Sequence, residues 1–176
     1  MLSMKSLSRD FVDAIRQTHG NELRKIKLSN NGLQCLKNIE YLSPVLEKLD
    51  LSCNDLHDIQ PLSLLSSLVE LDLSENRIDD ITSLGCLTNL KCLRLEGNNI
   101  TQLLTLEPLR NATALRELTL QGNPICVSDS STDTTDGTFP YNVFRMLPQL
   151  DILDQWYVPC LFLSYLSTPT SLTSLG

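Results

Sequence analysis

An asparagine recurs at nearly constant spacing through the middle of this chain, and its copies are Asn31, Asn54, Asn76, Asn98 and Asn123. The steps between them are 23, 22, 22 and 25 residues. Apolar side chains keep fixed offsets from each copy, and around Asn76 they are Leu68, Leu71, Leu73, Ile78 and Ile81. This spacing matches neither an amphipathic helix nor an alternating strand. Five registered copies disfavour a set of unrelated segments and predict a stack of similar coils.

Within one coil, we predict a short strand from Glu70 to Ser74 that directs Leu71 and Leu73 inward. The amide of Asn76 is expected to bond backbone groups that the turn leaves unpaired. A period of this size with this consensus is typical of leucine-rich repeats. The predicted fold class is therefore an α/β solenoid: a right-handed leucine-rich repeat superhelix with a concave parallel β-sheet and short convex helices or 3₁₀ turns.

The segments around the repeats are expected to close the two ends of the stack. We predict an N-terminal helical cap at 1–20, five repeats at 21–126, a flexible Ser/Thr/Asp loop at 127–138, a C-terminal cap at 139–157 and a tail without a predicted structure at 158–176. Ser8 is the expected helix N-cap. Phe11 and Ile15 are expected to cover the first coil and not to bind a partner. In the longer fourth return, a full α-helical turn is expected to start near Glu107 and Pro108.

The loop at 127–138 has two interpretations: a surface insertion, which we favour, and a phosphorylated or partner-binding loop. The 176-residue chain has a net charge of −7 and a pI near 4.7, which argues against nonspecific nucleic-acid binding and is compatible with a basic protein partner. Its six cysteines lack metal-ligand spacing and predict free thiols in a reducing compartment. No secretory signal is visible, and the apolar run at 158–166 is too short to span a membrane. We therefore expect an intracellular protein without membrane contact.

Catalysis is not expected from this sequence. His19 and His57 lie in different parts of the predicted solenoid, and no nucleophile elbow, phosphate-binding loop or HExxH motif is present. Asp50 beside Asp72 offers too few oxygens for a divalent cation. We predict no enzyme activity, no cofactor and no metal site.

Side chains that point outward from the predicted strands form the candidate binding face. The residues expected to contact a partner are Lys25, Lys27, Lys48, Asp50, Glu70, Asp72, Arg94, Glu96, Glu117 and Thr119. One hypothesis treats Asp50, Glu70, Asp72 and Glu75 as an acidic patch that captures a basic segment of a partner. In the alternative, cross-strand neutralisation occurs within the pairs Lys27–Asp50, Lys48–Glu70 and Asp72–Arg94.

Two motifs carry a family resemblance. The triplet Asn123-Pro124-Ile125, followed by YNVFRMLPQLDILD at 141–154, resembles the C-terminal cap of SDS22-like leucine-rich repeat proteins. Relatives with this cap include the acidic nuclear phosphoprotein family, the spliceosomal A-prime protein, an axonemal dynein light chain and several ciliary or centrosomal proteins. The stretch LEPL at 106–109 looks most like the acidic nuclear phosphoproteins.

Five registered repeats with a charged inner surface and no catalytic set predict a noncatalytic scaffold that binds a protein partner on its concave face. We expect a monomer within a hetero-complex that is cytoplasmic, at the cilium or centrosome, or nuclear. One alternative is a ribonucleoprotein component similar to the spliceosomal A-prime protein, in which Lys25, Lys27 and Lys48 contact RNA. Another is a regulatory subunit of a phosphatase.

Overall fold

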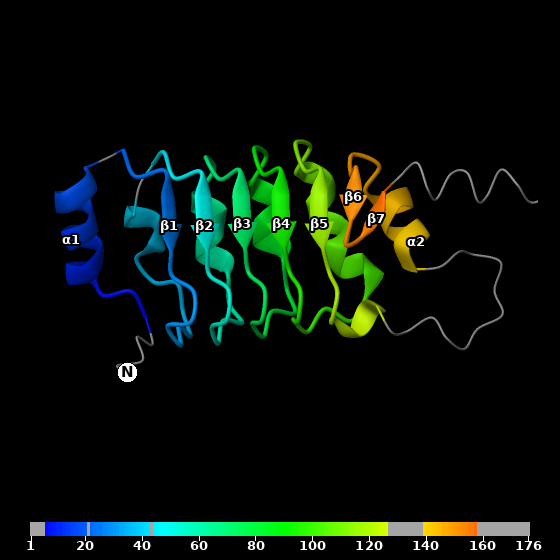
Figure 1. Cartoon of the computed structure of the whole chain (residues 1–176), viewed down its shortest axis with the longest axis horizontal. Helices are drawn as coiled ribbons and strands as arrows, with labels where there is room; N and C mark the ends of the chain where they lie inside the picture. Colours follow the sequence, from blue (N-terminus) through cyan, green and yellow to red (C-terminus); the bar gives the residue numbers. More distant parts are fainter. Residues whose placement is uncertain (1–5, 21, 43, 127–138, 158–176) are drawn as a thin grey trace, which may run out of the picture.

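A single sheet runs the length of the molecule, in a computed structural model that describes residues 6–20, 22–42, 44–126 and 139–157. Its strands pair in chain order, and those from β1 to β6 are parallel, whereas β7 is antiparallel to β6 (Figure 1). The strands are β1 (Lys25–Lys27), β2 (Lys48–Asp50), β3 (Glu70–Asp72), β4 (Cys92–Arg94), β5 (Glu117–Thr119), β6 (Ile152–Leu153) and β7 (Trp156–Tyr157).

Each inner strand buries its central residue and turns the two flanking residues to the opposite side, because side chains alternate along a strand. The central residues are in register from strand to strand and at most 2% exposed: Leu49, Leu71, Leu93 and Leu118. Strand β3 ends at Asp72, two residues before the predicted end. The ladder itself continues, since the Leu73 N–H donates to the carbonyl of Arg94 at 2.9 Å.

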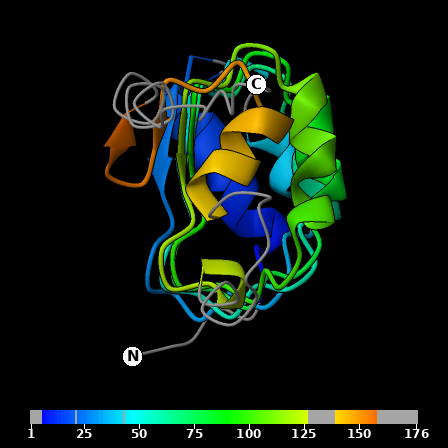
Figure 2. The same cartoon turned by 90° about the vertical axis from the view of Figure 1, so that its right-hand side faces the viewer.

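The return segments form the predicted short 3₁₀ helices, which lie on the side opposite the strands (Figure 2). They are η1 (Ile39–Tyr41), η2 (Gln60–Leu64), η3 (Thr82–Cys86) and η4 (Leu103–Asn111). A further 3₁₀ helix, η5 (Pro124–Cys126), directly follows Asn123 at the lower edge of the stack in Figure 2. The predicted α-helical turn near Glu107 is wrong: η4 is a 3₁₀ helix that starts at Leu103 and contains Pro108. Extra residues in this return therefore lengthen a 3₁₀ helix, whose tighter winding keeps it stacked on η3.

One continuous apolar core, from Leu7 to Leu153, fills the space between the sheet and the 3₁₀ helices. The repeated asparagines line its edge, and Asn76 shows their role. Its Oδ1 accepts the Leu56 N–H, and its Nδ2 donates to the carbonyls of Leu51 and Leu73, all at 3.0 Å. Equivalent bonds repeat at Asn54, Asn98 and Asn123. These bonds confirm the predicted function of the asparagine in four of the five copies, whereas the half-buried Asn31 amide donates to the Ser29 carbonyl of its own coil.

The N-terminal end of the stack is covered by α1 (Arg9–His19). The Ser8 side chain accepts the Phe11 N–H at 3.1 Å, which confirms the predicted N-cap. Val12 is buried, and Phe11 and Ile15 pack against the core. Leu7, just before the helix, is also part of the core and only 1% exposed.

The C-terminal end is closed by α2 (Phe139–Met146), which ends before Pro148 as predicted, and by the β6–β7 hairpin. Asp154 stands at the turn between these strands. Its Oδ1 accepts the N–H groups of Leu120 (2.6 Å) and Gln121 (3.0 Å). In an inner coil the N–H equivalent to that of Leu120, such as that of Leu95, donates to a strand carbonyl instead. The predictions for 127–138 and 158–176 lie outside the described residues.

Candidate protein-binding face

The outward side chains of β1 to β5, together with Glu96 after β4, form what we call the strand face. Cross-strand pairing confirms that the predicted residues form two columns. The first column is Lys25, Lys48, Glu70, Cys92 and Glu117, and the second is Lys27, Asp50, Asp72, Arg94 and Thr119. A shallow hollow on this face lies over β1 to β4. The structure thus brings the predicted residues together, and their contact with a partner stays a prediction.

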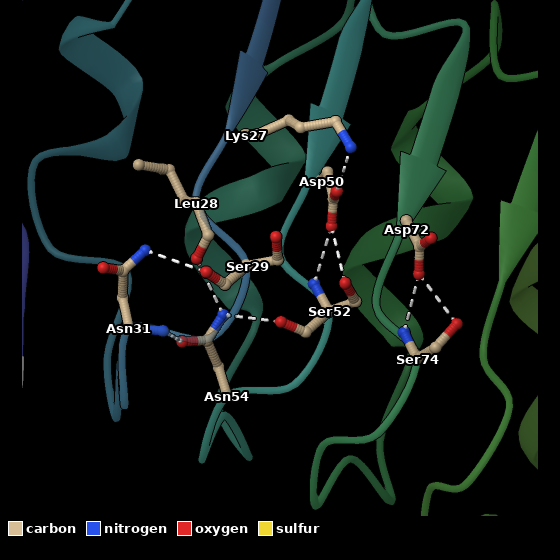
Figure 3. A network of polar contacts seen from close by, with 9 residues as sticks. All are labelled: Lys27, Leu28, Ser29, Asn31, Asp50, Ser52, Asn54, Asp72 and Ser74. Carbon is tan, nitrogen blue, oxygen red and sulfur yellow. Dashed lines mark hydrogen bonds and ion pairs between the residues drawn. The ribbon is translucent and has the colours of Figure 1, made fainter.

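At the N-terminal end of the strand face, opposite charges pair within the molecule. The Lys27 Nζ lies 3.5 Å from Asp50 Oδ2 (Figure 3), and the ammonium of Lys48 pairs with the carboxylate of Glu70. Burial raises the pKa of Asp50, but hydrogen bonds from the Ser52 hydroxyl (2.7 Å) and N–H (3.1 Å), with Lys27, outweigh it and leave this pKa below its ordinary value. Asp50 therefore stays ionised, and the ammonium of Lys27 offsets its negative charge.

The third predicted pair, Asp72–Arg94, does not form: no ion pair joins these neighbours in the described structure, and each stays without an opposite charge. Asp72 Oδ1 instead accepts the Ser74 N–H (3.0 Å) and hydroxyl (2.7 Å), as drawn in Figure 3. The same hydroxyl lies 2.5 Å from Glu96 Oε2. A hydroxyl has one proton, so it can donate to only one of these carboxylates at a time.

The acidic patch is consequently placed differently from the sequence hypothesis. Asp50 and Glu70 are paired with lysines. The carboxylates of Asp72, Glu75 and Glu96 have no cationic partner among the residues that the structure describes. We call these three residues the open acidic patch. Sequence reasoning missed Glu96 as part of it, although the recurring Asp-Leu-Ser motif at 50–52 and 72–74 marked the strand ends that position Ser74.

Cys92 lies in the middle of the first column. Burial, with a hydrogen bond to Glu117 and the nearby charge of Glu70, raises its pKa to about 11 despite the opposing charge of Arg94. Its sulfur is therefore a neutral thiol at ordinary pH and a poor nucleophile. In the described part of the chain, no three His, Cys, Asp or Glu side chains are grouped so that they could hold a metal ion.

Two further observations bound the chemistry of this surface. His19 belongs to α1, whereas His57 lies beside the 3₁₀ helix η2, so the structure keeps the two histidines apart. Among the described helices, none has the length and apolar character to cross a membrane.

Comparisons with known proteins agree with this architecture. A family model described as "Leucine-rich repeat" matches residues 4–156. A chain of the Drosophila melanogaster SNF/U2A′ complex is 26% identical with a TM-score of 0.67, over 88% of this chain and 86% of that chain. Two internalins of Listeria monocytogenes are also similar. InlC2 is 26% identical with a TM-score of 0.60, over 76% of this chain and 51% of that chain.

The second internalin, InlF, shares the fold, with 24% identity and a TM-score of 0.55 over 82% of this chain and 55% of that chain. This chain thus spans about half of either internalin. A search of curated proteins found no match. The family match covers nearly the whole described solenoid, including both ends. The chain belongs to the leucine-rich repeat family.

Proposed function

We propose that this chain is a noncatalytic scaffold whose strand face receives a segment of a partner protein. The observation that supports it is the strand face itself. Its charged side chains stand on a regular sheet, the core does not need them, and the described helices lie behind the sheet or at its ends (Figures 1 and 2). A solenoid presents such a surface as a ready-made binding platform.

The partner segment is basic where it crosses β3 and β4. No cation of the described residues forms an ion pair with the open acidic patch, although Arg94 is the cross-strand neighbour of Asp72, so Lys or Arg side chains of a partner would supply the missing ion pairs there. Complementary charge of this kind increases the association rate and the specificity. The similar chain of known structure comes from the SNF/U2A′ complex, which agrees with a monomer acting within a hetero-complex.

Proximity labelling in cells with the tagged full chain tests this function. The double variant Asp72→Lys/Glu96→Lys should lose the labelled partners of the wild type, because it makes the open acidic patch basic. A matched control, Glu22→Lys/Glu107→Lys, reverses two exposed carboxylates away from the strand face and should keep them. Reversal of Asp50, Glu70 and Asp72 together should also abolish capture. Identical partner sets for both double variants would contradict the proposal.

A second candidate is a ribonucleoprotein component, cytoplasmic or nuclear. It is favoured by the likeness to the chain from the SNF/U2A′ complex and by Lys25, which is exposed and has no ion pair among the described residues. Lys27 and Lys48 support it less, because carboxylates already neutralise them. Titration of single-stranded RNA at rising salt tests it, since phosphate contacts weaken steeply with salt. Absent or salt-independent binding excludes the ribonucleoprotein candidate.

The proximity-labelling experiment also reports the compartment. The identities of the labelled proteins distinguish the cilium or centrosome from the nucleus.

A further inference from the structure

The convex side carries exposed apolar side chains at regular places. Across the described residues, the exposed large apolar side chains are Tyr41, Leu64 and Leu104, at 38%, 66% and 68%. Tyr41 and Leu64 occupy equivalent positions of η1 and η2, 23 residues apart. The guanidinium of Arg9 lies 4.3 Å from the Tyr41 ring centroid and covers one ring face. Isolated exposed apolar residues are common on protein surfaces, so their exposure alone indicates nothing.

Leu64 differs from Leu104 because it borders a hollow. The hollow lies between η1 and η2, and we call it the convex hollow. Leu64 and Pro61 line it from η2, and Cys35 and Leu36 line it from the preceding coil. Leu104 has the same exposure but does not line it. The convex hollow thus exposes an apolar surface formed by Leu64 and Pro61, which we call the apolar seat, and the described side chains around it leave it open.

An acidic edge borders this seat. Asp58 lines the convex hollow and also a second hollow that contains Asp79 and Asp80. Asp58 accepts the Gln60 N–H at 2.9 Å, and Asp80 accepts the N–H (2.8 Å) and hydroxyl (2.6 Å) of Thr82. These hydrogen bonds orient the two carboxylates, and those from Thr82 hold the pKa of Asp80 below its ordinary value.

The three carboxylates have no ion pair with any described residue. Lys37 and Glu40 also line the convex hollow, and their opposite formal charges add no net charge there. The acidic edge therefore stays without compensation from the described chain. An apolar seat beside one sign of charge is complementary to an amphipathic segment of the opposite sign.

We propose that the convex hollow and its acidic edge bind a cationic amphipathic segment of a second partner protein. An apolar side chain of that segment packs on Leu64 and Pro61, and its Lys or Arg side chains pair with Asp58, Asp79 and Asp80. This surface lies on the side of the molecule opposite the strand face. It is therefore independent of the proposed strand-face function.

The test uses the full chain and a fluorescent helical peptide with Leu at positions i, i+3, i+4 and i+7 and Lys elsewhere. Fluorescence anisotropy measures its affinity. Leu64→Glu should lower the affinity at least about tenfold, because it places a charge in the apolar seat. Leu104→Glu, equally exposed, is the matched control and should change it less than about twofold. Asp58→Asn/Asp79→Asn should weaken binding and flatten its salt dependence.

Several results would overturn this inference. One is no binding of the Lys peptide, and another is equal binding of a peptide with Glu in place of Lys. Equal losses in Leu64→Glu and Leu104→Glu would show that the convex hollow does not matter. Loss in Asp72→Lys/Glu96→Lys with none in Leu64→Glu would place the peptide on the strand face. That last result contradicts the inference and leaves the proposed function intact.

Discussion

At the scale of single residues, one amide side chain completes the turn of each inner coil. Asn54, Asn76, Asn98 and Asn123 are between 1% and 9% exposed. Each accepts a backbone N–H of the coil before it and donates to carbonyls of that coil and its own. A buried polar backbone group without a partner costs about 1–3 kcal/mol. These asparagines are therefore structural and not binding residues.

Asn76→Ala should lower the free energy of unfolding by about 1–3 kcal/mol, since the buried Leu56 N–H loses its acceptor, whereas the carbonyls of Leu51 and Leu73 keep a second donor in Asn54 and Asn98. Urea denaturation followed by circular dichroism measures the change. Asn99→Ala, at the exposed neighbouring position of the next repeat, should change it by less than about 0.5 kcal/mol. Similar values for the two variants would refute a role for the buried amide.

Cys92 should be alkylated much more slowly than the exposed Cys35, Cys53 and Cys86. Its pKa is raised to about 11 from an ordinary value of 9.0, so the thiolate that reacts is about 100-fold scarcer below pH 9. Mass spectrometry of iodoacetamide-treated protein at pH 8 gives the rate for each cysteine. Labelling of Cys92 as fast as Cys86 would show that its thiol is not buried as described.

At the scale of elements, the repeat pattern predicted the strands well because each strand needs only one inward leucine. The repeat pattern also predicted the turns at the asparagines. It did not show where the backbone becomes left-handed, because Cys53 (φ 54°) and Glu75 (φ 55°) hold the place that Gly97 and Gly122 hold in later coils. Charge pairing was predicted only in part. The repeat register places Asp72 beside Arg94, but the Asp72 carboxylate accepts a hydrogen bond from the Ser74 hydroxyl and forms no ion pair with Arg94.

The 3₁₀ helices are stacked so closely that one position admits no side chain. A Cβ on Gly85 of η3 would lie 2.7 Å from the carbonyl oxygen of Pro108 in η4. Gly85→Ala should therefore destabilise the protein by about 1–3 kcal/mol, which thermal and urea unfolding can measure. Thr88→Ala, an exposed substitution just after η3, is the control with an expected change below about 0.5 kcal/mol. An unchanged stability of Gly85→Ala would mean that η3 and η4 can separate at no cost.

At the scale of the whole molecule, each coil contacts mainly its neighbours, and the ends need separate solutions. A solenoid is stabilised by repeat and interface terms that act locally. At the start, α1 covers the first coil. At the end, the Asp154 carboxylate takes the place of a strand carbonyl for the Leu120 N–H, which completes the ladder between β5 and β6. Composition and repeat spacing indicated that caps were needed, but not that a carboxylate would close the ladder.

Asp154→Ala should loosen the C-terminal coils first, because the amides of Leu120 and Gln121 lose their acceptor. Hydrogen–deuterium exchange should show faster exchange at these amides and in β5 and β6. The Leu51 and Leu73 amides, in the ladder beside β2 and β3, should stay protected. In a solenoid each repeat is stabilised mainly by its neighbours, so a local loss of stability has less effect on distant repeats. A uniform loss of protection along the chain would indicate one cooperative unit instead.

The asparagine bonds that join one coil to another all run in one direction, and this bears on how the chain folds on the ribosome. Asn54 hydrogen-bonds the backbone of Leu28 and Leu33, and Asn76 hydrogen-bonds the backbone of Leu51 and Leu56. The backbone bonds of each coil are therefore completed by a side chain that is synthesised one repeat later. Synthesis proceeds from the N-terminus, and folding can follow it. A nascent chain would therefore carry one unfinished coil at its growing end until residue 154 leaves the exit tunnel.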